Sequence, residues 1–136
     1  MADAGPRTAH VKENGNSAFA VDILVSNHRL CGDEPREAGG GNTAPAPYDF
    51  LATALGTCTV MTMRWYARQK NLPLEHAEAF ITHEKRDGKD HFVKKLVVKG
   101  AALTDEQRAK LLDVAAKCPV HRTLTSDITI ETQWND

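Results

Sequence analysis

An uncharged stretch, residues 51–63, constrains the fold of this 136-residue chain more than any other feature. Apolar side chains recur through it at helical spacing, and basic residues collect just after it, where a helix would end. A helix that is apolar around most of its circumference must be buried on several sides. A chain this short cannot cover all of those sides, so the stretch predicts an obligate dimer. The residues at helical spacing are Leu51, Leu55, Cys58, Met61 or Thr62, and Trp65.

Alternating residues and turn signals precede this helix. Residues 8–13 and the alternating segment 18–25 lie on either side of Asn14-Gly15, which predicts a β-hairpin, with a further strand around residues 28–31. Residues 32–47 are rich in Gly and Pro, and their composition favours a flexible connector.

A second hairpin, a helix and a strand are predicted after the long helix. Residues 79–85 and 92–99 flank Asp87-Gly88, another turn signal. Thr104 opens a helix with a capping box, and Pro119 marks its end. Its apolar face is assigned to Ala109, Leu112 and Ala115 or Ala116, and the alternation of residues 128–134 predicts a half-buried strand. The fold class is therefore α+β, with two antiparallel hairpin regions packed around a long central helix.

Composition excludes several classes of function. Lys and Arg number 17 and Asp and Glu number 18, so the net charge of −1 gives no reason to expect nucleic acid or an anionic membrane as partner. The mean hydropathy is −0.43, and no run approaches the ~20 apolar residues of a membrane span. The first ten residues lack the pattern of a secretory signal. We expect one domain over residues 1–136, a cytoplasmic location and no cofactor.

The chain contains three dispersed cysteines, and each could be either a structural residue or a reactive thiol. Cys31 is expected on a strand without a polar partner and is interpreted as structural. Cys58 is either a small buried apolar residue or a reactive thiol, and the threonines around it favour the second interpretation. Cys118 is expected at the end of the second helix, where the dipole disfavours a thiolate, so it suits either a resolving thiol or a core position. Cys118 and His121 have the spacing of a zinc pair, but the sequence shows no second local pair, and we expect no metal.

Two segments of the sequence, taken together, form a combination of motifs that is more specific than either segment alone. Residues 39–63 read GGGNTAPAPYDFLATALGTCTVMTM, and residues 116–124 read AKCPVHRTL. A loop rich in Gly and Pro that leads into a helix with a central cysteine, followed far downstream by a Cys-Pro pair, resembles the OsmC/Ohr family of osmotically induced and organic hydroperoxide resistance proteins. The resemblance is to an OsmC-like branch and spans nearly the whole chain.

This resemblance implies an intertwined homodimer with the two long helices at its centre. It also implies a thiol peroxidase of oxidative and osmotic stress defence, in which Cys58 corresponds to the peroxidatic and Cys118 to the resolving cysteine. The substrate would be an organic hydroperoxide, and an external dithiol, with a lipoyl group as one candidate, would reduce the disulfide. The family's site also contains an arginine and an acid, for which Arg36 or Arg29, and Asp49, lie in the matching region.

Physical chemistry sets further conditions on such a site. The attacking sulfur must be a thiolate, and an ordinary thiol with a pKa of ~8.5 is only a few per cent ionised at neutral pH, so a cation such as arginine is needed. Asp49 precedes Cys58 by nine residues, which is ~13 Å along a straight helix and on its opposite side. Asp49 therefore acts through an arginine, serves the site of a partner chain, or only caps the helix. The alternative function is a catalytically weak binding or redox-sensing protein of the same fold.

Overall fold

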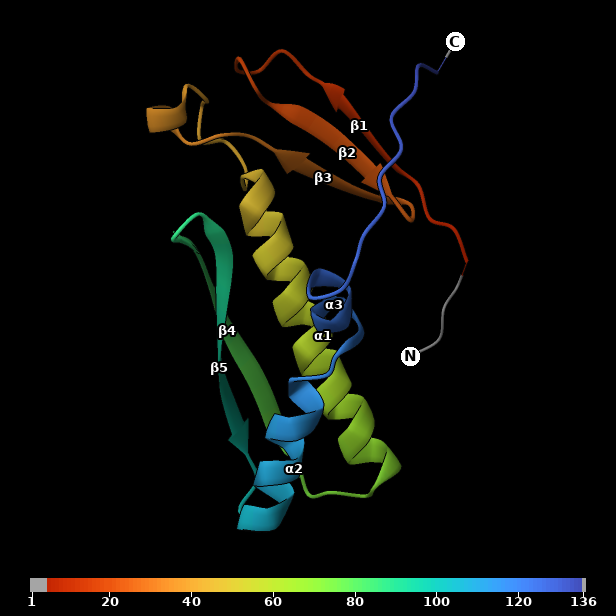
Figure 1. The fold of residues 1–136 in the computed structure, drawn as a ribbon, viewed down its shortest axis with the longest axis vertical. Helices are drawn as coiled ribbons and strands as arrows, with labels where there is room; N and C mark the ends of the chain where they lie inside the picture. Colours follow the sequence, from red (N-terminus) through yellow and green to blue (C-terminus); the bar gives the residue numbers. More distant parts are fainter. Residues whose placement is uncertain (1–4, 136) are drawn as a thin grey trace. The chain divides into compact units, whose positions relative to one another are not determined.

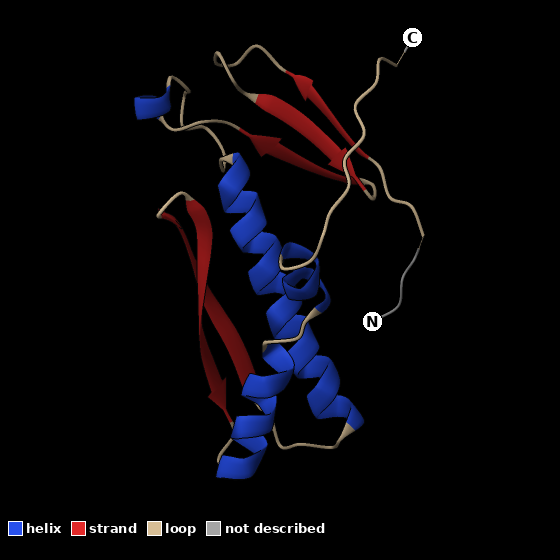
Figure 2. Ribbon diagram, viewed as in Figure 1, coloured by secondary structure: helices blue, strands red, loops and turns tan. Residues whose placement is uncertain are grey.

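The computed structural model describes residues 5–135 and shows an α+β architecture, which confirms the predicted fold class (Figure 1). The elements in chain order are β1 (Ala9–Glu13), β2 (Val21–Val25), β3 (His28–Gly32), the 3-10 helix η1 (Arg36–Ala38), α1 (Pro47–Gln69), β4 (His76–Arg86), β5 (Lys89–Lys99), α2 (Asp105–Ala115) and α3 (Pro119–Leu124). They form a three-stranded sheet, β1-β2-β3, and a two-stranded sheet, β4-β5 (Figure 2). None of the helices within residues 5–135 is both long and apolar enough to cross a bilayer.

The chain divides into two compact units, one ending at Thr53 and the other beginning at Ala54. The first unit is an antiparallel meander in which Ala9 pairs with Val25 and Val21 pairs with Gly32. Both predicted strands of the first hairpin and the third strand are therefore confirmed. The turn at Asn14 is wider than two residues, because its N–H bonds the carbonyl of Ala20 at 3.1 Å.

Residues 33–43 form a loop built around one carboxylate rather than the flexible connector that the composition favours. Asp33 is only 2% exposed and accepts hydrogen bonds from the hydroxyls of Ser17 and Thr43, both at 2.7 Å. It also accepts from the backbone N–H groups of Glu34, Gly41 and Thr43. A buried carboxylate is stable only when donors surround it in this way. The hydrogen bonds, led by that of Thr43, hold the pKa of Asp33 far below its usual value.

One glycine of this loop is required by a close backbone approach. A Cβ atom on Gly40 would overlap the backbone carbonyl of Glu34 and would lie 2.8 Å from a carboxylate oxygen of Asp33. Any larger residue would therefore push the backbone away from the carboxylate that holds it. The glycine run thus serves a tight fold of the chain around Asp33.

The β4–β5 hairpin and three helices make up the second unit. Phe80 pairs with Lys95 and Arg86 with Lys89, and Asp87 and Gly88 both have positive φ angles, as the predicted two-residue turn requires. Helix and hairpin come close at Gly56, where a Cβ would lie 2.9 Å from the side chain of Ile81. Figure 1 shows the hairpin running alongside α1.

Two apolar clusters hold the second unit together. One joins α1 to α2 and to the inner face of the hairpin, and the other joins α1 to α3 and the same face. The buried members of the first are Met63, Ala67, Leu74, Leu111 and Ala115. Those of the second are Leu55, Cys58 and Cys118.

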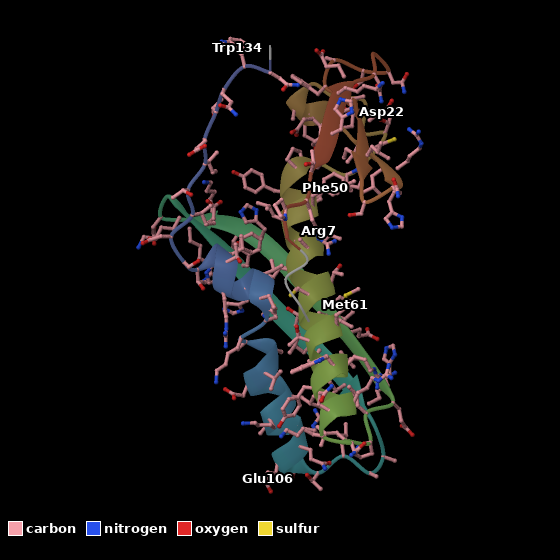
Figure 3. The ribbon with its side chains drawn as sticks, turned by 90° about the vertical axis from the view of Figure 1, so that its right-hand side faces the viewer. Arg7, Asp22, Phe50, Met61, Glu106 and Trp134 are labelled. Carbon is pink, nitrogen blue, oxygen red and sulfur yellow. The ribbon has the colours of Figure 1, made fainter. Side chains whose placement is uncertain are left out.

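The long helix is confirmed, but its predicted apolar face is only partly the buried one. Leu51, Met61 and Trp65 are all exposed, Met61 by 56% and Trp65 by 46%, and Met61 projects outward from α1 (Figure 3). The helix is therefore apolar on a side that the described residues leave uncovered. The residues that are buried instead are Leu55, Cys58, Thr59, Thr62, Met63 and Ala67.

The second predicted helix begins as expected and ends earlier. Thr104 and Gln107 form the capping box, each side chain bonding the other's backbone N–H at 3.0 Å. Its buried face contains Leu111, whereas the predicted Leu112 is exposed, because the core lies one residue further round the helix. The helix stops at Ala115, and a short further helix, α3, starts at Pro119. The short helix α3 was not predicted from the sequence.

The predicted C-terminal strand is wrong. Residues 127–135 contain no strand, and Ile130 and Trp134 are 86% and 90% exposed. Trp134 lies on an extended segment (Figure 3). A strand needs a neighbouring strand to bond its backbone groups, and no described strand pairs with this segment.

Asp33→Asn should destabilise the protein at neutral pH, because the amide can no longer accept every hydrogen bond that the carboxylate accepts. The folded-state pKa of Asp33 is lowered, so its stabilising effect is present above the unfolded value near 3.8 and is lost as pH falls below it. Thermal unfolding of wild type and variant should differ at pH 7 and converge as pH drops below about 4. Glu37→Gln, an exposed change in the same loop, is the control and should leave the melting temperature unchanged.

Candidate active site

The second apolar cluster contains two cysteines that come from distant parts of the sequence. Cys58 lies in the middle of α1, and Cys118 lies in the turn between α2 and α3. Both are buried, both are reduced, and they pack in the same buried cluster. The fold therefore brings together the two cysteines that the sequence selects.

Cys118 has an environment opposite to the expected one. It is not at a helix C-terminus: it is the N-cap of α3, and its sulfur accepts the N–H of His121 at 3.4 Å. The hydroxyl of Thr59 lies 3.6 Å from the same sulfur. Burial alone would raise the pKa of Cys118, but the hydrogen bonds from Thr59, His121 and Cys58, with the nearby charge of Lys94, outweigh it and lower the pKa.

Cys58 has the less favourable environment for a thiolate. Burial raises the pKa of Cys58, and the adjacent Cys118 raises it further. The backbone N–H of Val120 donates to its sulfur at 3.4 Å and opposes this shift, and the hydroxyl of Thr62 lies 4.0 Å away. Within the second unit, the negative charge of the reduced pair is therefore more stable on Cys118.

A lysine supplies positive charge beside the pair. Lys94 on β5 donates hydrogen bonds to Thr59 Oγ1 at 3.1 Å and to the carbonyl of Ala115 at 2.6 Å. Burial lowers the pKa of Lys94, and attraction to the two thiols opposes that shift. His121 also faces this region: burial and the charge of Lys94 lower its pKa, and its buried Nδ1 has no hydrogen-bond partner among residues 5–135.

The other predicted site residues belong to the first unit. Arg36 is on η1 and Arg29 is on β3. Asp49 accepts the backbone N–H of Ala46 at 2.9 Å, which is the helix-capping contact left open by the sequence. Cys31 is exposed on β3, and its thiol lies 3.9 Å from the Asp22 carboxylate, a polar neighbour that the sequence did not predict.

The zinc alternative has little geometric support. Within the part of the chain that the structure describes, His, Cys, Asp and Glu residues form no group of three able to hold a metal ion. His121 contacts the pair through its backbone, whose N–H donates to the sulfur of Cys118.

Comparison with known proteins agrees with this arrangement. The family model described as OsmC-like protein matches residues 39–133, which include the Gly-rich loop and both cysteines. The chain belongs to the OsmC-like family. No curated protein sequence matches it significantly.

Solved structures share the fold of this OsmC-like chain. A protein of Psychrobacter arcticus, described as an osmotic stress induced and detoxification response protein, has 21% identity and a TM-score of 0.71, with 90% of this chain and 91% of that chain covered. An OsmC-like protein of Mycoplasma pneumoniae has 16% identity and a TM-score of 0.73, with 90% and 89% covered. An organic hydroperoxide resistance protein OsmC of Legionella pneumophila has 17% identity and a TM-score of 0.66, with 91% and 92% covered.

Two residues of this OsmC-like site were missed from the sequence. Thr59 was noted only as a polar neighbour of Cys58, and Lys94 was taken as part of a strand. The available signal was the alternation on β5: Lys94 occupies an inward position of the same strand face as Phe92 and Leu96, which pack into the two clusters. A lysine at an inward strand position needs a buried partner.

Mild oxidation with diamide should form a disulfide between Cys58 and Cys118 within one chain, because the two thiols are already in contact. Mass spectrometry of peptides under non-reducing conditions should show this single linkage. Cys31→Ser should form the same disulfide, and Cys118→Ser should form none. Recovery of Cys31 in an intrachain linkage would contradict the geometry.

Proposed function

We propose that this protein is a thiol-dependent organic hydroperoxide reductase in which Cys58 is the peroxidatic cysteine and Cys118 the resolving cysteine. The observation that carries the proposal is the contact of these two buried, reduced thiols across the second unit. Membership of the OsmC-like family supports it, as does the hydroperoxide resistance function named for the Legionella pneumophila relative.

The reaction requires two thiolate steps. In the first, the Cys58 thiolate attacks the terminal oxygen of R–OOH, the O–O bond breaks, and the departing alkoxide takes a proton to give R–OH. Cys58 then carries a sulfenic acid. In the second, the Cys118 thiolate attacks the Cys58 sulfur, a disulfide forms, and hydroxide leaves and is protonated to water. An external dithiol reduces the disulfide by exchange and is itself oxidised.

The geometry suits the second step directly. The hydrogen bonds around Cys118 lower its pKa, which favours the thiolate that the resolving step needs. The first step needs an added cation, because the pKa of Cys58 is raised by burial. Arg36, or Arg29, is proposed to supply that cation, with Asp49 orienting it.

A homodimer is part of the proposal. Met61 and Trp65 are exposed on α1, and the alternating segment from Ile128 to Trp134 has no strand partner among residues 5–135. A second copy of the chain offers both an equivalent apolar helix face and free strand edges. Both features thus favour the intertwined dimer that the family resemblance implies.

Light scattering at micromolar concentration should give about twice 14.9 kDa. Met61→Glu, which places a charge on the proposed helix interface, should shift the mass toward the monomer. Leu112→Glu, an equally exposed apolar position on α2, is the matched control and should stay dimeric. A wild-type protein that is a stable, folded monomer would overturn the dimer.

The order of the two thiols can be tested with an alkyl hydroperoxide. Cys118→Ser should be oxidised once and stop at a sulfenic acid on Cys58 that dimedone traps, and excess peroxide should carry it to the sulfinic acid. Cys58→Ser should consume almost no peroxide, and Cys31→Ser should behave like wild type. Mass spectrometry after brief treatment decides the order: equally rapid oxidation of Cys118 in the absence of Cys58 would reverse the assigned roles.

One observation favours a second candidate function. Because the pKa of Cys58 is raised by burial, a chain in which no arginine activates it would be a slow redox sensor or binding protein rather than a peroxidase. Thiol loss on adding one equivalent of alkyl hydroperoxide separates the two: a rate no faster than that of free cysteine identifies the sensor or binding protein.

A further inference from the structure

Thr59 occupies a position from which one hydrogen atom can serve two acceptors. Its hydroxyl is fully buried and lies 2.7 Å from the carbonyl of Leu55, to which it donates. It also lies 3.6 Å from the Cys118 sulfur. A hydroxyl has a single hydrogen and can turn it toward either acceptor. Toward the carbonyl, the oxygen can accept the Cys118 S–H; toward the sulfur, the hydroxyl donates to a thiolate.

Lys94 acts on the same oxygen from the hairpin side. Its ammonium donates to Thr59 Oγ1 at 3.1 Å, and donation into a hydroxyl oxygen makes the hydroxyl a stronger donor to its own acceptor. The second bond of Lys94, to the carbonyl of Ala115 at 2.6 Å, fixes the ammonium at the end of α2. The positive charge therefore reaches the sulfur through Thr59.

We propose that Lys94 is a positioning residue that acts through Thr59 to hold Cys118 as a thiolate, so that these two residues set the rate at which the disulfide closes rather than the rate of peroxide attack. This inference rests on the proposed dithiol function. Within it, Thr59 contacts the reacting sulfur, and its hydroxyl proton turns from Leu55 to Cys118 as the thiol ionises. The thiol proton leaves to water. The Cys118 thiolate then attacks the sulfur of the Cys58 sulfenic acid, and the hydroxide that leaves is protonated to water.

The titratable groups that face Cys118 come from three elements. Among the described residues they are Cys58 on α1, Lys94 on β5 and His121 on α3. From β4 the cluster receives only the apolar side chain of Ile81. Lys94 is thus the amine in this set, and its charge, together with the hydrogen bond from Thr59, lowers the pKa of Cys118.

A merely structural role is the alternative for Lys94, because its bond to Ala115 caps α2. Thr59→Val separates the two roles: it removes the hydroxyl at nearly constant volume and leaves the bond between Lys94 and Ala115 in place. Thr59→Ser keeps the hydroxyl and should restore wild-type behaviour. Lys94→Arg keeps the charge, and Lys95→Met, the exposed neighbour on the same strand, is the matched control for Lys94→Met.

The first measurement is a thiolate titration by absorbance at 240 nm in the Cys31→Ser, Cys58→Ser background, taken as the difference from the same protein lacking Cys118. It needs no reagent to reach the buried sulfur. The titration midpoint should move upward in Thr59→Val and Lys94→Met, and should stay in place in Thr59→Ser and Lys95→Met. An unchanged midpoint in Thr59→Val overturns the proposal, even if Lys94→Met fails to fold.

The second measurement is a single turnover with an alkyl hydroperoxide in chains that keep both Cys58 and Cys118. At pH 7, Thr59→Val should form the sulfenic acid no more slowly than wild type, because less negative charge on Cys118 opposes ionisation of Cys58. It should close the disulfide roughly tenfold more slowly, the effect of losing one hydrogen bond to a charged sulfur. Closure should then accelerate with rising pH in the variant but not in wild type. A slower first step with unchanged closure would overturn the assignment to Cys118. If the wild-type protein does not react with the hydroperoxide, the proposed peroxidase function is wrong. The titration still tests whether Lys94 and Thr59 control the ionisation of Cys118.

Discussion

The donors that surround the buried sulfur of Cys118 are the interactions on which the second unit depends. An ion removed from water is costly unless donors and an opposite charge replace its hydration. Here the N–H of His121, the hydroxyl of Thr59 and the ammonium of Lys94 replace it around Cys118. They come from α3, α1 and β5, so this environment forms only when these elements fold together.

The same constraint explains the unequal environments of the two thiols. Two adjacent sulfurs cannot both ionise at neutral pH, because like charges in a low-dielectric site repel strongly. Cys58 has only the N–H of Val120 as a close backbone donor, whereas Cys118 has several partners. A negative charge on the reduced pair is therefore better stabilised on Cys118, the thiol to which the proposed function assigns the resolving step.

Local signals in the sequence predicted the fold well. The Asp87-Gly88 turn, the capping box at Thr104 and the uncharged helix are each encoded within a few neighbouring residues, and all three are confirmed. The site was predicted only in part. Cys58 and Cys118 were selected, but the partners of Cys118 come from residues far away in the sequence. The position of Cys118 also depended on one boundary: ending the second helix at Ala115 moves Cys118 from a C-terminus to an N-cap, which reverses the effect of the helix dipole.

The two failures of the apolar pattern have one physical explanation. Sequence alternation in residues 128–134 and helical periodicity at Met61 and Trp65 both predict burial, and both are exposed in the described chain. Such patterns predict that a face is buried, but they do not say which chain would bury it. Residues 128–134 alternate like a strand but pair with no described strand. Their backbone groups are therefore available to a strand of another chain. The exposed Ile130 and Trp134, together with the uncovered side of α1, therefore form one argument for a second copy. A monomer would have to leave both apolar faces in water.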